Sequence, residues 1–125
     1  MIPGSEKDHP SFFQSFRYAL EGLKTATRTE RNINVMLAAA LVALVLGFVL
    51  KIDIVSWCLV LLCCGIVITA ELLNTAIETV VDLCCQEINP LAKRAKDIAA
   101  AAVYVMSFVS AIIGIVIFGH ALGLW

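Results

Sequence analysis

Apolar and polar positions divide the chain into one amphipathic segment and three long apolar ones. Between Phe12 and Asn32, apolar residues recur at steps of three and four, as on one face of a helix. These residues are Phe12, Phe16, Leu20 and Leu23. The charged residues of the segment fall elsewhere on the helical wheel. We therefore predict an amphipathic helix over residues 12–32 that lies in the membrane surface.

The three apolar segments have the length of membrane spans. Val35 to Leu50 carries no polar side chain, and with Ile33 and Asn34 it approaches the roughly 20 residues that cross a hydrocarbon core of about 30 Å. The second segment starts after a short polar break at residues 51–53, and the third follows a loop at residues 86–89. We expect spans at about 33–50, 54–82 and 98–122.

Two of these segments begin with recognisable helix caps. Asp53 precedes the second span and is a residue type that accepts hydrogen bonds from the first N–H groups of a helix. Asn89-Pro90 reads as an N-cap followed by proline at the first helical position. We predict that Asp53 and Asn89 cap the helices that follow them.

Composition supports a membrane protein. Of the 125 residues, 61% are hydrophobic and 15% are charged, against roughly half and a quarter in soluble proteins. Disordered chains and nucleic-acid binders need more charge and fewer apolar side chains, so both classes are excluded. No G-x-x-x-x-G-K-[ST] or G-x-G-x-x-G motif occurs, and the chain is too short for a nucleotide-binding domain. The fold class that we predict is an all-α membrane protein.

The basic residues indicate the orientation in the membrane. Eight of the nine Lys and Arg residues lie before the first span or before the third, and only Lys51 lies between the first and second. Under the positive-inside rule, the side with the eight basic residues is cytoplasmic. Residues 1–11 form a polar tail without the apolar core of a signal peptide. We expect a multi-pass protein with a cytoplasmic N-terminus.

Small residues recur at four-residue spacing in two spans, as Ala39, Ala43 and Gly47 and as Gly119 and Gly123. Such spacing lets helices approach closely. Small residues are also compatible with lipid, and the pattern leaves both readings open. The five cysteines form no Cys-x-x-Cys motif, so we read them as small apolar packing residues.

Four polar side chains fall on one face of the second span. With the angular position of Glu71 on a helical wheel set to zero, Asn74 lies at about −60°, Glu78 at about −20° and Asp82 at about +20°. We call these four residues the acidic face; it is about 16 Å long. Its two ends differ in depth, because Asp82 and Glu78 are near the cytoplasmic end and Glu71 lies deeper.

A carboxylate at membrane depth costs at least roughly 2.5–3.5 kcal/mol, so the acidic face needs polar partners or a metal ion. One such residue alone is often the structural partner of a Lys or Arg, but no span contains a basic residue next to this face. A desolvated Glu71 suits a general base acting on a lipid alcohol, and Glu78 suits a divalent cation. Glu30, before the first span, could share that cation as Mg²⁺.

The third helix begins with Lys93, Arg94, Lys96 and Asp97. Such cations on the cytoplasmic side set the topology, and they can also bind a polyphosphate. Lys96 and Asp97 are the two that we single out for that second role.

The motifs E-x-x-N-x-A-x-E-x-x-x-D and A-K-D make the chain resemble the bacterial integral-membrane diacylglycerol kinase and undecaprenol kinase family. They lie at residues 71–82 and 95–97, with Gly22 and Glu30 at the offsets of the family upstream. The resemblance covers nearly all of residues 12–122. It implies a homotrimer in the bacterial cell membrane, with a surface helix and three spans per chain and active sites composed between subunits near the cytoplasmic face.

The resemblance also implies roles for individual residues. Glu71 would be the catalytic base, Asn74 would orient the base or the lipid hydroxyl, and Glu30 and Glu78 would bind Mg²⁺ with ATP. The remaining residues that would line the nucleotide are Tyr18, Glu87, Asn89, Lys96 and Asp97. The chain departs from the family at Asn89, where a histidine is usual, and from the undecaprenol branch at Asn34 and Val35, where Arg and His are frequent. N-P-L-A-K-R-A-K-D, in contrast, is more similar to the undecaprenol branch.

The predicted function is therefore transfer of the γ-phosphoryl group of ATP to a membrane lipid alcohol, either undecaprenol or diacylglycerol. Two alternatives remain at this point. A small proton-coupled transporter could use Glu71 as its proton carrier, and a structural or regulatory oligomer would need no chemistry. Glu30 with Lys96 and Asp97 favours the kinase, because a proton carrier needs no metal and polyphosphate site.

Overall fold

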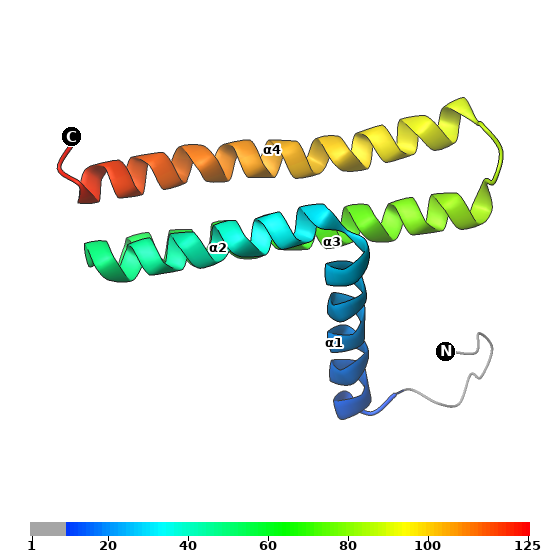
Figure 1. Ribbon diagram of the computed structural model, residues 1–125, viewed down its shortest axis with the longest axis horizontal. Coiled ribbons are helices and arrows are strands. Elements are labelled where there is room, and N and C mark those ends of the chain that lie inside the picture. Colours follow the sequence, from blue (N-terminus) through cyan, green and yellow to red (C-terminus); the bar gives the residue numbers. More distant parts are fainter. Residues whose placement is uncertain (1–9) are drawn as a thin grey trace.

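A computed structural model of the chain describes residues 10–125 as four helices joined by short connections (Figure 1). The helices are α1 (Phe12–Thr29), α2 (Arg31–Leu50), α3 (Ile54–Cys84) and α4 (Pro90–Ala121). No strand occurs in this part of the chain. The all-α fold class is confirmed. Most of the predicted polar tail, residues 1–11, lies outside the described residues.

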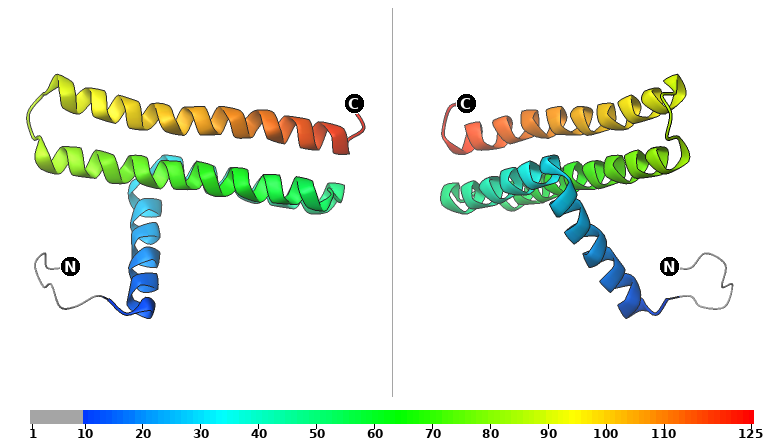
Figure 2. Two further views of the ribbon diagram at one scale, coloured as in Figure 1. Left: turned by 180° about the vertical axis from the view of Figure 1, so that it is seen from behind. Right: turned by 45° about the vertical axis from the view of Figure 1, so that its right-hand side comes forward.

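The three long helices lie side by side, and α1 turns away from them (Figures 1 and 2). Helix α3 packs most extensively on α4 and also contacts α2. Helices α2, α3 and α4 are long and apolar enough to cross a membrane, which confirms the three predicted spans. Their outward faces carry large exposed apolar side chains such as Phe48 and Phe108, as expected for surfaces that meet lipid or another protein.

The junction between α1 and α2 differs from the prediction. The sequence pattern carried the first helix to Asn32, but α1 ends at Thr29, and Glu30 has extended backbone with φ −114° and ψ 118°. The side-chain amide of Asn34 donates to the carbonyls of Thr27 at 2.7 Å and Glu30 at 3.3 Å. Carbonyls at a helix end lack hydrogen-bond partners within the helix. The Asn34 amide supplies a donor to these carbonyls and so stabilises the break between α1 and α2.

The two predicted helix caps are confirmed. The Asp53 carboxylate accepts hydrogen bonds from the backbone N–H groups of Val55 and Ser56 at 3.0 and 3.2 Å. The Ser56 hydroxyl also donates to it, and these hydrogen bonds hold the pKa of Asp53 below its usual range. Asn89 accepts from the Leu91 N–H at 2.8 Å, with Pro90 in the first turn of α4. Because α4 begins at Pro90, the basic residues 93–96 form its first turns.

The small residues serve different purposes. Gly47 is buried where α2 meets α3, and a Cβ atom there would lie 2.8 Å from the Trp57 ring. Gly119 is covered in the same way by the Trp125 ring. Ala39 and Ala43 instead line a cavity between the helices. Close approach is therefore required at Gly47, whereas Ala39 and Ala43 leave space open.

Replacing Gly47 by alanine is expected to destabilise the protein. The new methyl group would force the Trp57 ring out of its packing with Phe48, whose ring centroid is 4.7 Å away, and such overpacking costs about 1–3 kcal/mol. The matched control is Gly65→Ala, because no atom lies near a Cβ at that helical position. Alanine there removes the glycine penalty of roughly 0.5–1 kcal/mol. The midpoint temperature of thermal unfolding in detergent should fall for Gly47→Ala and should rise or stay unchanged for Gly65→Ala. Equal shifts of the two midpoints would contradict the close contact at Gly47.

Candidate active site

The deep end of the acidic face is buried inside the bundle. Glu71 is 2% exposed and Asn74 is 8% exposed, and they are the buried polar side chains of residues 10–125. The Asn74 amide donates to the Glu78 carboxylate at 3.2 Å, which confirms that these residues share a face of α3. The other amide atom, Asn74 Oδ1, is buried and has no partner among the described residues. An acceptor of this kind is available to a bound ligand.

Glu71 and Asn74 form part of the wall of a cavity of about 200 Å³ between α2, α3 and α4. Its lining comprises Asn32, Val35, Met36, Glu71, Asn74, Ala100, Val103, Tyr104 and Ser107. We call it the polar cavity. It places the buried carboxylate against a space that a small headgroup can enter.

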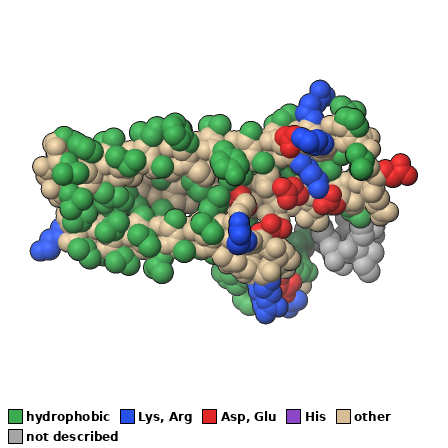
Figure 3. All heavy atoms as spheres, turned by 45° about the horizontal axis from the view of Figure 1, so that its top comes forward, with side chains coloured by type: hydrophobic (Ala, Val, Ile, Leu, Met, Phe, Trp, Pro, Cys, Tyr) green, Lys and Arg blue, Asp and Glu red, His purple; other side chains and the backbone are tan. Residues whose placement is uncertain are grey.

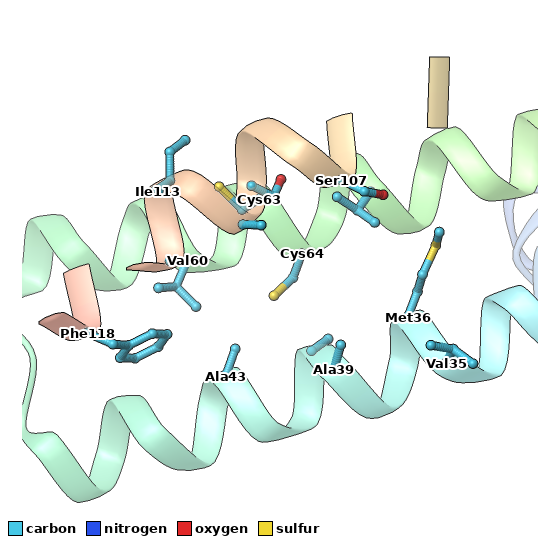
Figure 4. A pocket seen from close by; sticks show the side chains of 15 residues that line it. Val35, Met36, Ala39, Ala43, Val60, Cys63, Cys64, Ser107, Ile113 and Phe118 are labelled. Atoms are coloured by element: carbon cyan, nitrogen blue, oxygen red, sulfur yellow. The ribbon is translucent and has the colours of Figure 1, made fainter. Parts of the chain in front are cut away.

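A second, larger cavity between the helices adjoins the polar cavity. It has a volume of about 430 Å³ and shares Val35, Met36 and Ser107 with the polar cavity. Val60 and Cys64 of α3 project towards Ala43 of α2, and Phe118 of α4 lies at one end (Figure 4). We call it the apolar cavity. Its surface suits a hydrocarbon chain rather than a headgroup.

Two further carboxylates lie near Glu71. The charges of Glu30 and Glu78 both act on the Glu71 carboxylate, and Asn32 lines the polar cavity together with Glu71. Glu30 occupies the break between α1 and α2, so this break carries a carboxylate towards α3. No group of three or more His, Cys, Asp or Glu side chains in residues 10–125 is close enough to hold a metal ion.

The carboxylates of Glu30 and Glu78 nevertheless fit a Mg²⁺ ion that binds together with a nucleotide. Mg²⁺ is commonly held by one or two carboxylates, and water and phosphate oxygens complete its coordination. Glu30 in the break before α2 and Glu78 on α3 supply two carboxylates, which is enough for such a site and too few for an all-protein cage.

The shallow end of the acidic face is joined to α4. Lys96 donates from Nζ to the Asp82 carboxylate at 2.5 Å, linking α3 to α4. Asp97 pairs with Lys93 within α4. The Lys93–Asp97 pair is exposed, whereas Asp82 is exposed and Lys96 only partly so in the pair between the helices. Figure 3 shows that acidic and basic side chains gather at this end of the molecule, whereas hydrophobic side chains dominate the other end. The two residues singled out at the start of α4 therefore each have an acidic or basic partner.

The remaining predicted nucleotide residues lie apart from Glu71. Tyr18 is on α1 and is 52% exposed. Glu87 is exposed in the loop before α4, where its carbonyl accepts from the Cys85 thiol. Asn89 is occupied as the cap of α4, which gives this residue a local role where the family usually has histidine. Within one chain, none of these three lines the polar cavity.

Sequence reasoning missed three polar residues of the polar cavity: Asn32, Tyr104 and Ser107. Asn32 was assigned to the end of the surface helix, whereas it belongs to the first turn of α2. Ser107 and Tyr104 are isolated polar residues in an apolar span. Their positions at a helical spacing of three on α4 were the available signal, but only the packing of α3 on α4 shows that they face Glu71.

Comparisons with known proteins agree with these features. The family described as prokaryotic diacylglycerol kinase matches residues 17–118. Undecaprenol kinase of Bacillus subtilis is 46% identical over 116 residues, covering 90% of this chain and 94% of that protein. Diacylglycerol kinase of Helicobacter pylori is 37% identical, covering 81% and 79%. Diacylglycerol kinase of Escherichia coli K12 is 35% identical, covering 76% and 78%.

The family match spans most of the chain and includes Glu30, the whole acidic face, and Lys96 with Asp97. The resemblance inferred from the motifs is thereby confirmed. This chain belongs to the prokaryotic diacylglycerol kinase family of membrane lipid kinases.

Proposed function

We propose that this chain transfers the γ-phosphoryl group of ATP to the hydroxyl group of undecaprenol, at the cytoplasmic face of the bacterial membrane. One observation carries the proposal: a buried carboxylate, Glu71, lines a headgroup-sized cavity together with an unpartnered amide oxygen, Asn74 Oδ1. Diacylglycerol is the alternative acceptor. Family membership gives no support to the proton-coupled transporter.

Glu71 acts as the general base. Its carboxylate takes the proton of the lipid hydroxyl as the oxygen attacks phosphorus, and its burial keeps water away from the reacting atoms. Asn74 is held by its hydrogen bond to Glu78, so Oδ1 is presented to the same hydroxyl. These two residues fix which lipid oxygen reacts.

Glu30 and Glu78 hold Mg²⁺ together with the nucleotide phosphates. When bound, Mg²⁺ neutralises charge on the phosphate oxygens. The two carboxylates place that charge beside Glu71, at the cytoplasmic end of the cavity. This arrangement gives each of the three acids a role, two of them on α3 and one in the break between α1 and α2.

Lys96, Asp97, Tyr18, Glu87 and Asn89 bind the nucleotide. Lys96 stabilises charge on the transferred oxygens. Its partner Asp82 lies eleven residues beyond Glu71 on α3, which is about 16 Å along the helix. Reacting groups in phosphoryl transfer must come within about 3–3.5 Å of one another. This separation favours a site composed from two chains, and the homotrimer that the family resemblance implies would supply one.

The choice of undecaprenol is supported by two features. The Bacillus subtilis relative named undecaprenol kinase is 46% identical, whereas the relatives named diacylglycerol kinase cited above are 37% and 35% identical. The N-P-L-A-K-R-A-K-D segment at the start of α4 also resembles that branch. With detergent-solubilised protein, labelled ATP and Mg²⁺, we expect faster label transfer to undecaprenol than to diacylglycerol; the reverse order would assign the chain to the other substrate.

Glu71→Gln should abolish turnover. The amide keeps the size of the side chain but cannot accept the hydroxyl proton, so the rate is expected to fall at least about 10²–10⁴-fold. Equilibrium ATP binding should be nearly unchanged. The matched control is Glu21→Gln, which removes an exposed carboxylate paired with Arg17 on α1. A near-normal rate in Glu71→Gln would show that Glu71 is not the base.

Glu78→Gln should raise the Mg²⁺ concentration needed for half-maximal rate by roughly 10–100-fold, the value of a lost charge-assisted interaction. The amide oxygen can still accept from Asn74, so the polar cavity keeps its shape. A Mg²⁺ titration of the initial rate measures the effect, with Glu21→Gln again as the control. An unchanged Mg²⁺ dependence would remove Glu78 from the metal site.

Mixing two inactive variants tests the composite site. Glu71→Gln and Lys96→Ala chains, unfolded separately and refolded together, should regain activity because some sites then combine an intact Glu71 with an intact Lys96 from the neighbour. Each variant refolded alone serves as the baseline. Activity that never exceeds the baseline, in mixtures shown to form mixed oligomers, would place both residues in one chain.

A further inference from the structure

The Ser107 hydroxyl is buried without a hydrogen-bond partner, which distinguishes it from four threonine hydroxyls of the helices. Four threonine hydroxyls donate to a backbone carbonyl three or four residues earlier, at 2.8–3.1 Å: Thr25, Thr27, Thr29 and Thr79. Ser107 Oγ is buried and makes no hydrogen bond to any described residue. A helical serine can bond its own preceding turn, and buried polar atoms without a partner are rare. The hydroxyl is therefore available to a ligand.

Ser107 also has a distinctive position. Three residues line both the polar cavity and the apolar cavity, and Ser107 is the polar one among them, beside Val35 and Met36. Figure 4 shows Ser107 on α4 near Met36 of α2, at the edge of the apolar cavity. The second unpartnered buried atom, Asn74 Oδ1, belongs to the polar cavity. Both unpartnered atoms thus border the same space.

We propose that Ser107 is a specificity-determining contact for the lipid alcohol: its hydroxyl donates to a lipid oxygen in the polar cavity while one hydrocarbon chain of the same lipid lies in the apolar cavity. This proposal rests on the proposed lipid kinase function and adds a residue and a path for the chain. A lipid hydroxyl is both donor and acceptor, so it can accept from Ser107 and donate towards Glu71 or Asn74 Oδ1.

A hydrocarbon chain is the occupant that fits best. A buried water needs two to four polar partners, and the apolar cavity is lined mainly by alanine, valine, cysteine and aromatic or aliphatic side chains. The walls of the two cavities also share Val35, Met36 and Ser107, so the cavities adjoin each other, as the spaces for the polar end and the apolar tail of one molecule must. Ala39 and Ala43 keep this space open, since larger residues there would fill it.

Substitutions at Ser107 test the contact. Ser107→Ala removes the hydroxyl without adding volume, and we expect the KM for the lipid alcohol to rise on the order of 3- to 10-fold, the effect of one neutral hydrogen bond. The KM for ATP should not change, and Ser107→Thr, which keeps a hydroxyl, should stay near the wild-type KM. Thr79→Val is the control, because it removes a hydroxyl that is bonded to its own helix outside both cavities. Equal lipid KM values for wild type and Ser107→Ala would overturn the proposal.

Photo-crosslinking tests the path of the chain without turnover. A polyprenol carrying a diazirine in its tail, bound to the Glu71→Gln protein, should label residues of the apolar cavity such as Ala43 and Phe118. Ala43→Phe, which fills the cavity, should reduce this labelling, whereas Leu41→Phe on the exposed side of α2 should not. Labelling confined to the outward faces of the helices would show that the hydrocarbon chain does not lie in the apolar cavity. The same conclusion would follow if Ala43→Phe changed the size of the oligomer but left the labelling undiminished.

These two measurements separate the inference from the function on which it rests. Absence of labelled lipid phosphate with wild-type protein and every alcohol would defeat the proposed function, whereas crosslinks could still map to the apolar cavity. A working kinase whose lipid KM is insensitive to Ser107 defeats the inference alone.

Discussion

The cost of placing a carboxylate at membrane depth constrains the whole arrangement. Glu71 is nearly inaccessible, and an ionisable group in hydrocarbon costs at least roughly 2.5–3.5 kcal/mol. No Lys or Arg occurs on α3, and α2 and α4 carry theirs at one end. The bundle shields Glu71 from lipid by packing α2 and α4 around it and by bringing Asn32 and Asn74 to its side. The break at Glu30 belongs to the same arrangement, because it lets α2 start beside α3 while α1 turns away.

The two ends of the acidic face have different electrostatics, and this difference suits phosphoryl transfer. Glu71 and Asn74 are fixed in the bundle interior, whereas Lys96 and Asp82 form an ion pair whose side chains are 35% and 65% exposed. Ion pairs near a protein surface contribute only about 0–1 kcal/mol, so the proposed exchange of Asp82 for a polyphosphate on Lys96 costs little. The deep end of the acidic face is thus rigid and its shallow end adaptable, as the proposed roles in lipid and nucleotide binding require.

Local rules predicted the features that depend on one helix. Periodicity predicted α1, the length of the apolar segments predicted α2 to α4, and the acidic face followed from the spacing of Glu71, Asn74 and Glu78. Asp53 and Asn89 were recognised as caps because a cap bonds residues two or three positions away. The break at Glu30 was missed because it depends on Asn34 reaching back seven residues to Thr27. Ser107 was missed because its position in the polar cavity arises only where α4 packs on α3.

The unpartnered atoms identify where function opposes stability. Asn74 Oδ1 and Ser107 Oγ are buried without partners, and a buried unsatisfied group costs about 1–3 kcal/mol. Cavities beside them add a further loss of packing. A sequence under pressure for stability alone would fill this space, for example by enlarging Ala43, and would pair or remove both atoms. Places where a fold departs from local rules are commonly functional sites. Here both departures border one space, which agrees with the proposal that a lipid alcohol completes this part of the core: its hydroxyl group would pair with the polar atoms, and its chain would fill the apolar cavity.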